Sequence, residues 1–273
     1  MKTFKEPQKL QKWCRARKLA GAKIALVPTM GYLHDGHLSL IREAKRRGAD
    51  EIVVSVFVNP VQFGPNEDYE KYPRDEKADL AKCREAGATA VFFPTPQNMY
   101  LGRHSVYVNE EDLSKGLCGA RRPGHFRGVC TVVAKLFNLA HPDFAVFGQK
   151  DYQQAQVIKR MVRDLNFDLK IVVAPIVREK SGLARSSRNT YLSSDERERA
   201  VAISRGLKSF GSKGGPKTLA ALAKSLEKAG LKVDYVECVD AETLEPRRTP
   251  RKGCCLLVAA YCGRTRLIDN RVL

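Results

Sequence analysis

Residues 24–37 read Ile-Ala-Leu-Val-Pro-Thr-Met-Gly-Tyr-Leu-His-Asp-Gly-His, and this stretch decides the expected fold. The apolar run at 24–29 predicts a short buried strand, and Gly31 lies in the glycine-containing turn that follows it. From Leu38 the apolar residues recur at helical spacing until Gly48. The turn therefore falls between a strand and a helix, where ligands collect in α/β proteins.

Outward from this stretch, strands and helices continue to alternate. Residues 52–58 form an almost continuous β-branched run, as expected of a strand covered on both faces. Further strands are expected at 90–93, 144–147 and 171–173, with helices at 75–86, 128–137 and 152–165. The predicted fold class is α/β: a Rossmann-like, mostly parallel sheet with helices on both faces.

The composition changes after about residue 177, which suggests a second domain. Residues 211–216, Gly-Ser-Lys-Gly-Gly-Pro, are the most linker-like stretch of the chain. Helices are expected at 194–209 and 218–229, and strands at 233–239 and 255–261. We expect a Rossmann-like domain at 1–176 and a smaller α+β domain at 177–273 that closes over the site.

The composition excludes several classes of protein. Of the 273 residues, 43% are hydrophobic and 29% are charged, an ordinary globular balance. No apolar run approaches the roughly 20 residues that span a bilayer, and the basic N-terminus lacks the apolar stretch of a secretory signal. The 8 cysteines form neither a CxxC pair nor a zinc pattern. We expect a cytoplasmic protein with reduced thiols and no membrane contact.

The charge is unusual. The chain has 48 Lys and Arg against 30 Asp and Glu, a net charge of +18. Such an excess suggests anionic ligands, from nucleotides to nucleic acid. The basic residues are dispersed, however, and no RNP-like aromatic segment accompanies them. A solvated basic surface is the simpler interpretation, and an RNA-binding protein remains an alternative of another class.

His34-x-Gly36-His37 is the sharpest local motif. A helix N-terminus presents unpaired N–H groups and partial positive charge, which suit phosphate, and glycines allow close backbone approach. Two imidazoles three residues apart lie on one side of a helical turn, where both can donate hydrogen bonds to phosphoryl oxygens. A bare HxxH is more often a pair of ordinary turn histidines. The strand before it and the helix after it favour a phosphate site, and a zinc site lacks a third ligand.

Other segments at strand ends or in loops carry polar groups that suit the same ligand. The loop at 182–189, Gly-Leu-Ala-Arg-Ser-Ser-Arg-Asn, offers hydroxyls and a guanidinium to phosphate. Residues 148–151 place Lys150 directly after a strand, and 59–63 place an amide and an aromatic ring there. The basic loop at 121–128 is suited to anionic substrates. Taken singly, each of these is also an ordinary turn or surface loop.

The HxGH turn together with the Ser-Ser-Arg loop resembles nucleotidylyltransferases and class I aminoacyl-tRNA synthetases. A closer resemblance is to the pantothenate synthetase (pantoate–β-alanine ligase) family, and it extends from about residue 24 to 270. Seven blocks carry it in the family's order and spacing: PTMGYLHDGHLSL, SVFVNPVQF, YPRDEKADL, RPGHFRGV, FGQKDYQQ, GLARSSRN and LIDN.

The resemblance implies a two-step ligation. Pantoate attacks the α-phosphate of ATP to give pantoyl adenylate and pyrophosphate, and the amine of β-alanine then releases AMP and pantothenate. Because no enzyme nucleophile is needed, positioning and charge stabilisation would supply the catalysis. The resemblance also implies Mg²⁺ and a homodimer. A nucleotidylyltransferase acting on a phosphorylated alcohol is the alternative among enzymes.

The resemblance assigns roles by motif. It implies catalytic roles for His34, His37, Lys150, Ser186, Ser187 and Arg188. It implies ATP contacts for Met30, Gly31, Tyr32, Leu33, His34, Asp35, Gly36, His37, Gly148, Gln149, Lys150, Asp151, Val177, Arg185, Ser186, Ser187 and Arg188. It implies pantoate and β-alanine contacts for Pro28, Met30, Asn59, Gln62, Arg122 and Gln154. Asp79 falls where the family has an acidic residue near magnesium.

The chain departs from the family pattern at Val61, Gln149, Ser181 and Arg185, and in the turn at 101–103. Arg185 stands where the family has Met or Leu, so its cation would either contact phosphate or point outward. None of these departures removes a group with a direct chemical task, and we expect activity.

Overall fold

The computed structural model describes residues 1–65 and 67–273. The chain forms two compact units. The first comprises Met1–Gly148 and Gln154–Ala174, and the second comprises Gln149–Gln153 and Pro175–Leu273. The chain thus enters the second unit briefly at 149–153, which the sequence pattern does not indicate, and again close to the boundary expected after residue 176.

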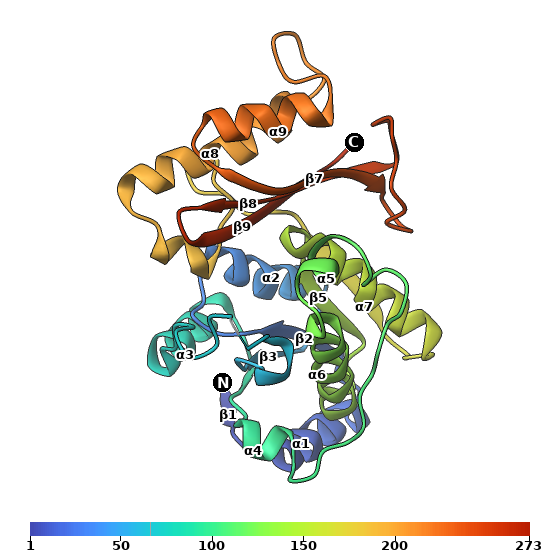
Figure 1. Cartoon of the computed structure of the whole chain (residues 1–273). Helices are drawn as coiled ribbons and strands as arrows, with labels where there is room; N and C mark the ends of the chain where they lie inside the picture. The colour runs from blue at the N-terminus through green and yellow to red at the C-terminus, as the bar shows by residue number, and fades with distance from the viewer. Residues whose placement is uncertain (66) are drawn as a thin grey trace. The chain divides into compact units, whose positions relative to one another are not determined.

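The first unit contains a six-stranded sheet, and every strand pair in it is parallel (Figure 1). Its strands are β1 (Lys2–Phe4), β2 (Ile24–Thr29), β3 (Glu51–Val56), β4 (Ala90–Phe92), β5 (Phe144–Gly148) and β6 (Lys170–Ala174), in the order β1-β4-β3-β2-β5-β6. The expected α/β class with a parallel sheet is confirmed, and β1 is an addition that its three residues do not reveal.

The strand order has one reversal that matters for function. From β2 the chain proceeds outward through β3 and β4, and it then returns to the other side of β2 with β5. β2 and β5 pair directly, with Ala25 opposite Phe144. The carboxyl ends of β2 and β5 therefore flank the topological switch point, where open α/β sheets bind their ligands.

The first unit contains the described helices α1 (Pro7–Leu19), α2 (Asp35–Arg46), α3 (Glu76–Ala86), α4 (Pro96–Met99), α5 (Leu117–Arg121) and α6 (His125–Ala140), and α7 (Tyr152–Asp164) from Gln154 onward. α1 packs against α6 and α2 against α3. Apolar residues of α2 and α3, including Leu40, Ile41 and Cys83, join Val54 and Val146 of the sheet in one buried core. This core fixes where α2 begins relative to β2.

The second unit is a three-stranded antiparallel sheet with two helices (Figure 1). The strands β7 (Lys232–Asp240), β8 (Cys254–Cys262) and β9 (Thr265–Val272) lie in that order. Helices α8 (Ser194–Ser209) and α9 (Leu219–Lys228) pack on each other, and leucines such as Leu207 and Leu222 form the core with β8. Short 3₁₀ turns occur in both units: η1 (Pro60–Gln62) in the first, and η2 (Gln149–Asp151) and η3 (Ser187–Tyr191) in the second.

All eight cysteines are free, as expected, and seven are buried, whereas Cys118 is half-buried. Burial raises the pKa of the Cys14 and Cys83 thiols to about 12, so these thiols are protonated and unreactive at neutral pH. Within residues 1–65 and 67–273, no helix combines the length and the apolar character needed to cross a membrane.

Candidate functional site

The HxGH motif forms the start of α2. His34 is the N-cap residue, and its Nδ1 accepts the backbone N–H of Gly36 at 3.1 Å. His37 occupies the third helical position, and its Nδ1 accepts the N–H of His34 at 3.3 Å. The two histidines thus form a reciprocal capping box. This box begins the helix at Asp35, three residues before the apolar pattern indicates.

These hydrogen bonds determine which ring nitrogen carries the proton. An Nδ1 that accepts a backbone N–H is unprotonated, so the neutral tautomer of each ring has its proton on Nε2. The rings are half-buried, and their centroids lie 4.1 Å apart. Each Nε2 is therefore a hydrogen-bond donor, and the two donors come from the same turn.

The other backbone amides of the turn have side-chain partners. Gly31 donates to Thr29 Oγ1 at 3.2 Å, and Tyr32 and Leu33 donate to the Asp79 carboxylate at 2.8 and 2.6 Å. Intramolecular acceptors thus hold the backbone N–H groups of residues 31–34 and 36.

A second cluster in the first unit surrounds η1. The Asn59 amide donates to Gln62 Oε1 at 3.1 Å and to the Gly128 carbonyl at 3.1 Å. Gln62 in turn donates from Nε2 to Met30 Sδ at 3.1 Å, and Gln62 is buried. The structure therefore brings Met30 together with Asn59 and Gln62, which belong to a segment about 30 residues further along the chain.

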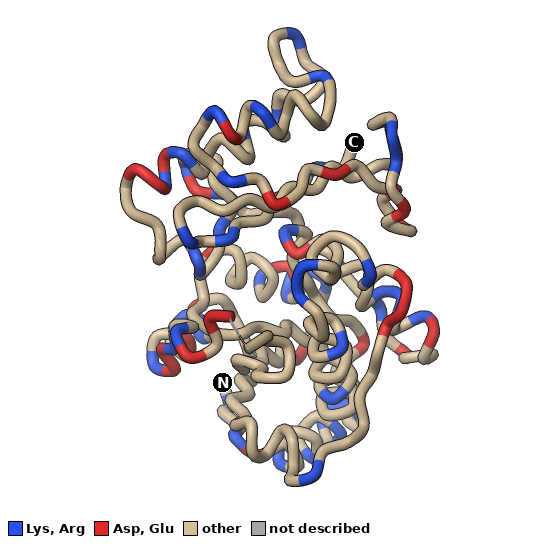
Figure 2. Tube along the Cα trace, in the orientation of Figure 1, with Lys and Arg blue, Asp and Glu red and all other residues tan. Residues whose placement is uncertain are grey.

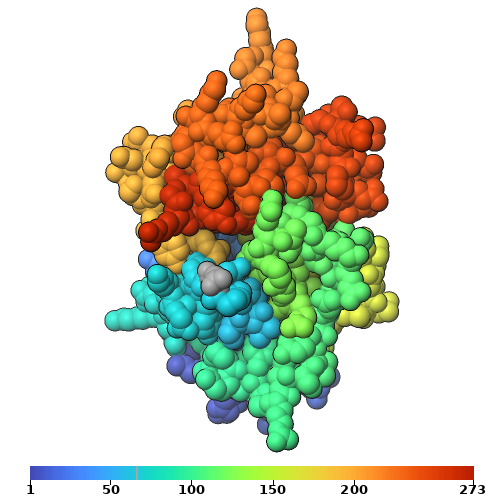
Figure 3. All heavy atoms as spheres, in the orientation of Figure 1, coloured from blue at the N-terminus to red at the C-terminus, as the bar shows by residue number. Residues whose placement is uncertain are grey.

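The basic loop around residue 122 supports this cluster. Arg122 donates to both carboxylate oxygens of Glu67, at 2.7 and 2.5 Å, and it contacts His125 Nε2 at 3.1 Å. His125 Nδ1 lies 2.9 Å from the Gln62 carbonyl oxygen, so this nitrogen carries the proton and donates. Residues 67–71, in cyan in Figure 3, lie at the surface of the first unit. Arg122 thus faces Glu67 and His125 and supports the main chain at Gln62.

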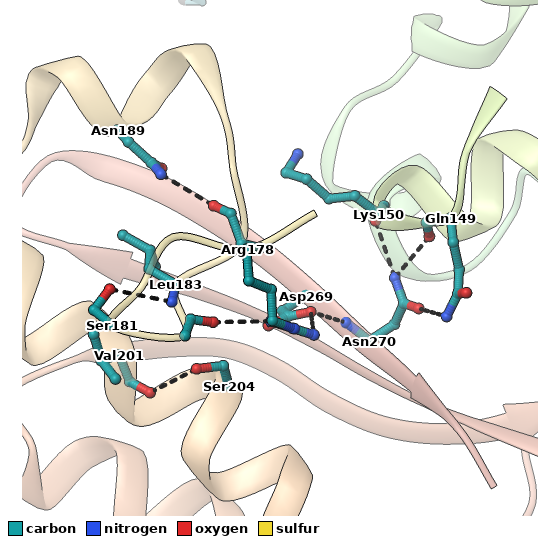
Figure 4. Close-up of polar contacts among 12 residues, drawn as sticks. Gln149, Lys150, Arg178, Ser181, Leu183, Asn189, Val201, Ser204, Asp269 and Asn270 are labelled. Atoms are coloured by element: carbon teal, nitrogen blue, oxygen red, sulfur yellow. Dashed lines mark hydrogen bonds and ion pairs between the residues drawn. The ribbon is translucent and has the colours of Figure 1, made fainter. Parts of the chain in front are cut away.

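In the second unit, Asn270 of β9 holds the η2 turn (Figure 4). Its Nδ2 donates to the carbonyls of Gln149 and Lys150, at 2.9 and 3.0 Å. Gln149 Nε2 returns a hydrogen bond to Asn270 Oδ1 at 3.1 Å. Lys150 Nζ lies 3.6 Å from Asp151. Asn270 ends the LIDN block of the sequence, and its role depends on a contact distant in sequence, which the motif alone does not reveal.

The carboxylate of Glu179 accepts hydrogen bonds from residues that flank the Ser-Ser-Arg loop. Glu179 accepts hydrogen bonds from Asn189 Nδ2 and from Arg197 Nη1, each at 3.0 Å. Asn189 also donates to the Ala184 carbonyl at 3.0 Å, and Arg197 donates to the Asn189 carbonyl at 2.8 Å. Arg185 Nη1 lies 3.9 Å from Glu179 Oε1. These hydrogen bonds fix the backbone on both sides of Ser186 and Ser187.

The charge state of Glu179 depends on these partners. Burial by itself raises the pKa of Glu179, but the hydrogen bonds from Asn189 and Arg197, with the charges of Arg197 and Arg185, outweigh it and lower the pKa below 4.5. A carboxylate with a lowered pKa contributes stability above its ordinary value of 4.5, and the contribution is lost as pH falls through the lowered pKa.

We expect Glu179→Gln to loosen the loop at neutral pH, since a charged hydrogen-bond acceptor is lost. Amide hydrogen exchange of peptides covering 178–189, measured between pH 3 and 7, should show the loop of the unchanged protein loosening on the acid side. The variant should lack this acid transition. Glu198→Gln, at an exposed position of α8, is the matched control and should behave like the unchanged protein. Equal exchange in Glu179→Gln and the control would contradict the role given to Glu179.

Lys and Arg residues occur in both units and alternate with Asp and Glu (Figure 2). Five of them line a groove of the second unit, of about 980 Å³. Its basic lining residues are Arg178, Lys180, Arg205, Lys208 and Arg271. Two of these cations are held structurally: Arg178 pairs with Asp269 at 2.6 Å, and Arg271 donates to the carbonyls at the end of α8. The described lining contains no aromatic ring on which an RNA base would stack, so the groove gives no support to RNA binding.

The resemblance places Asp79 near magnesium, and in the structure its carboxylate accepts hydrogen bonds from the backbone of the turn. Mg²⁺ requires near-octahedral oxygen ligands and keeps several waters. Asp79 is 1% exposed, and each of its carboxylate oxygens accepts a backbone N–H. In the part of the chain that the structure describes, no three His, Cys, Asp or Glu side chains are placed to hold a metal ion.

The remaining predicted residues have clear positions. Pro28 lies in β2 opposite Ser55 of β3, and Gly148 ends β5. Gln154 is half-buried in the first turn of α7. The Val177 carbonyl accepts the N–H of Arg185 at 2.9 Å. Lys150, Val177 and the Ser-Ser-Arg triplet belong to the second unit, whereas the HxGH turn belongs to the first.

The parallel sheet with its switch point between β2 and β5 belongs to the class of doubly wound α/β proteins, many of which bind nucleotides at that point. The model of the Pantoate-beta-alanine ligase family matches residues 2–272. The chain belongs to the pantoate-beta-alanine ligase family.

Individual relatives agree with this assignment. The chain is 55% identical to a pantothenate synthetase from Myxococcus xanthus, over 96% of this chain and 92% of the relative. A crystal structure of pantothenate synthetase from Thermus thermophilus superimposes with a TM-score of 0.89 at 43% identity and covers 99% of each chain. A pantoate-beta-alanine ligase from Francisella tularensis, complexed with beta-gamma ATP and beta-alanine, superimposes with a TM-score of 0.87 at 33% identity, over 100% of this chain and 97% of that one.

Proposed function

We propose that this chain joins pantoate to β-alanine in two ATP-dependent steps. A pantoate carboxylate oxygen attacks the α-phosphorus of ATP, the bond between the α-phosphorus and the bridging oxygen breaks, and pyrophosphate leaves. The neutral amine of β-alanine then attacks the acyl carbon of pantoyl adenylate. The acyl C–O bond breaks, AMP leaves, and the nitrogen loses a proton to form the amide of pantothenate.

The observation that carries the proposal is the histidine pair at the switch point of the sheet. Its two Nε2–H donors are fixed by backbone hydrogen bonds at Nδ1, and this orientation exists before any ligand binds. Donors fixed in advance stabilise charge that develops during phosphoryl transfer without a cost of reorganisation. The two N–H groups thus suit the negative charge that increases on the departing pyrophosphate.

The cluster around η1 suits the acid substrate. Gln62 Nε2 donates to the thioether of Met30, and a thioether is a weak acceptor. A carboxylate or hydroxyl of pantoate would replace that sulfur at little cost, because it is a stronger acceptor. Pro28, Asn59, Arg122 and Gln154 complete the proposed set for pantoate and β-alanine.

The remaining ATP contacts are proposed from the sequence motifs. They comprise Met30 to Asp35 with Gly36, Gly148 to Asp151, Val177, and Arg185 to Arg188. Lys150, Ser186, Ser187 and Arg188 would neutralise the phosphates and the leaving pyrophosphate. We further propose a homodimer and a cytoplasmic location, which the family resemblance supports. Magnesium would arrive bound to the phosphate oxygens of ATP, which are its preferred kind of ligand.

The first half-reaction gives a direct test. Exchange of labelled pyrophosphate into ATP, measured with magnesium and without β-alanine, should require pantoate. Adding β-alanine should then produce AMP and pantothenate in equal amounts. Exchange that depends instead on a phosphorylated alcohol would indicate a nucleotidylyltransferase. No exchange with any acid, despite measurable ATP binding, would reject the ligase proposal.

A further inference from the structure

Asp79 connects α3 to the turn that carries the two histidines. Its Oδ2 accepts the N–H of Tyr32 at 2.8 Å, and its Oδ1 accepts the N–H of Leu33 at 2.6 Å. Lys82, one turn further along α3, donates from Nζ to the Leu33 carbonyl at 2.6 Å. Asp79 and Lys82 lie on the same face of α3, and together they bind two backbone N–H groups and one carbonyl of the turn.

The turn needs this support because its backbone is unusual. Gly31 has φ +85° and Tyr32 has φ 50°, so two successive residues adopt the left-handed region. Such a conformation is disfavoured for a residue with a side chain, and it persists where the surroundings fix it. A Cβ on Gly31 would lie 2.9 Å from Val56 Cγ1 and 3.0 Å from Asp79 Oδ2, so the carboxylate packs directly under the turn.

The turn sets the position of both rings. His34 follows Leu33 directly and is the N-cap of α2, and the capping box couples His37 to it. If the amides of Tyr32 and Leu33 lose their acceptor, the N-cap shifts, and both Nε2–H donors shift with it. This consequence rests on the proposed role of the histidines in ATP chemistry.

We propose that Asp79 is a positioning residue for the histidine pair, and that its carboxylate acts on the backbone of the turn rather than on a metal ion. The two roles differ in a way that can be measured. A magnesium ligand affects ATP binding only when magnesium is present, whereas a positioning residue affects it equally with and without the ion.

The test compares Asp79→Asn with Asp75→Asn. Asp75 is the N-cap of the same helix, accepts the N–H of Ala78 at 2.9 Å and is exposed, so its variant removes the same charge away from the turn. ATP affinity is measured by calorimetry in EDTA and again in magnesium, and kcat is measured in magnesium. We expect Asp79→Asn to weaken ATP binding about 10-fold under both conditions and to lower kcat further. Asp75→Asn should match the unchanged protein.

Hydrogen exchange of the ligand-free protein gives a readout independent of activity. Peptides covering 30–38 should exchange faster in Asp79→Asn, while peptides of the second unit remain unchanged, which also shows that the variant is folded. A loss of affinity confined to magnesium, or exchange at 30–38 equal to that of Asp75→Asn, would overturn the proposal. If the unchanged protein fails to exchange labelled pyrophosphate into ATP, the ligase function is rejected. The hydrogen-exchange comparison would still show whether Asp79 holds the turn at 30–38.

Discussion

We expect His37→Ala to lower kcat for pantothenate formation about 100- to 1,000-fold while weakening ATP binding less than about 10-fold. The difference arises because a prearranged N–H donor interacts most strongly with the charge that develops as pyrophosphate departs. ATP in the ground state is held by other groups as well. Steady-state kinetics and calorimetry on the same preparation measure the two quantities.

The alanine variant also removes a helix cap, and a second variant separates the two effects. His37 Nδ1 accepts the N–H of His34 at 3.3 Å, and Gln at this third position is a standard capping-box residue. His37→Gln should therefore keep the melting temperature close to that of the unchanged protein but lose turnover as His37→Ala does. Turnover within twofold of the unchanged protein in His37→Gln would remove the imidazole from the mechanism.

Strong local patterns made much of the first unit predictable from sequence. The β-branched run of β3 and the apolar run of β2 bury both faces, so their type is evident without tertiary information. β1 has only three residues, and β9, Thr-Arg-Leu-Ile-Asp-Asn-Arg-Val, contains several polar residues. Their pairing partners, β4 and β8, determine them as strands, and such partners do not appear in a local pattern.

The chemistry of the site was predictable at the level of motifs, and its geometry was not. The HxGH turn was assigned correctly to a strand–helix junction, but the direction of its rings depends on a capping box between the two histidines. Asp79 lies 46 positions after Leu33 in sequence, and its contact with the turn depends on how α3 packs against α2. Glu179 and Asn270 act through similar long-range contacts. Tertiary packing decides such roles.

A substitution at Gly128 is expected to have a large effect on both stability and the binding of pantoate. It lies in α6, where a Cβ would approach the Val61 carbonyl oxygen to 2.5 Å and the Gln62 nitrogen to 2.6 Å. Real Cβ atoms essentially never come closer than 3.0 Å to another heavy atom, so Gly128→Ala must separate α6 from η1. The Gly128 carbonyl also accepts the Asn59 amide at 3.1 Å, and this hydrogen bond would be strained by the same movement.

We expect Gly128→Ala to lower the free energy of unfolding by about 1–3 kcal/mol, although alanine is the better helix former. The melting temperature should fall by several degrees. Because the displaced backbone carries Gln62, KM for pantoate should rise at least 10-fold while KM for ATP changes little. Gly102→Ala is the control, since a Cβ there meets nothing within 4 Å and its backbone is not left-handed. An unchanged KM for pantoate in a destabilised Gly128→Ala protein would show that the contact between α6 and η1 serves stability alone and that Gln62 does not hold the acid.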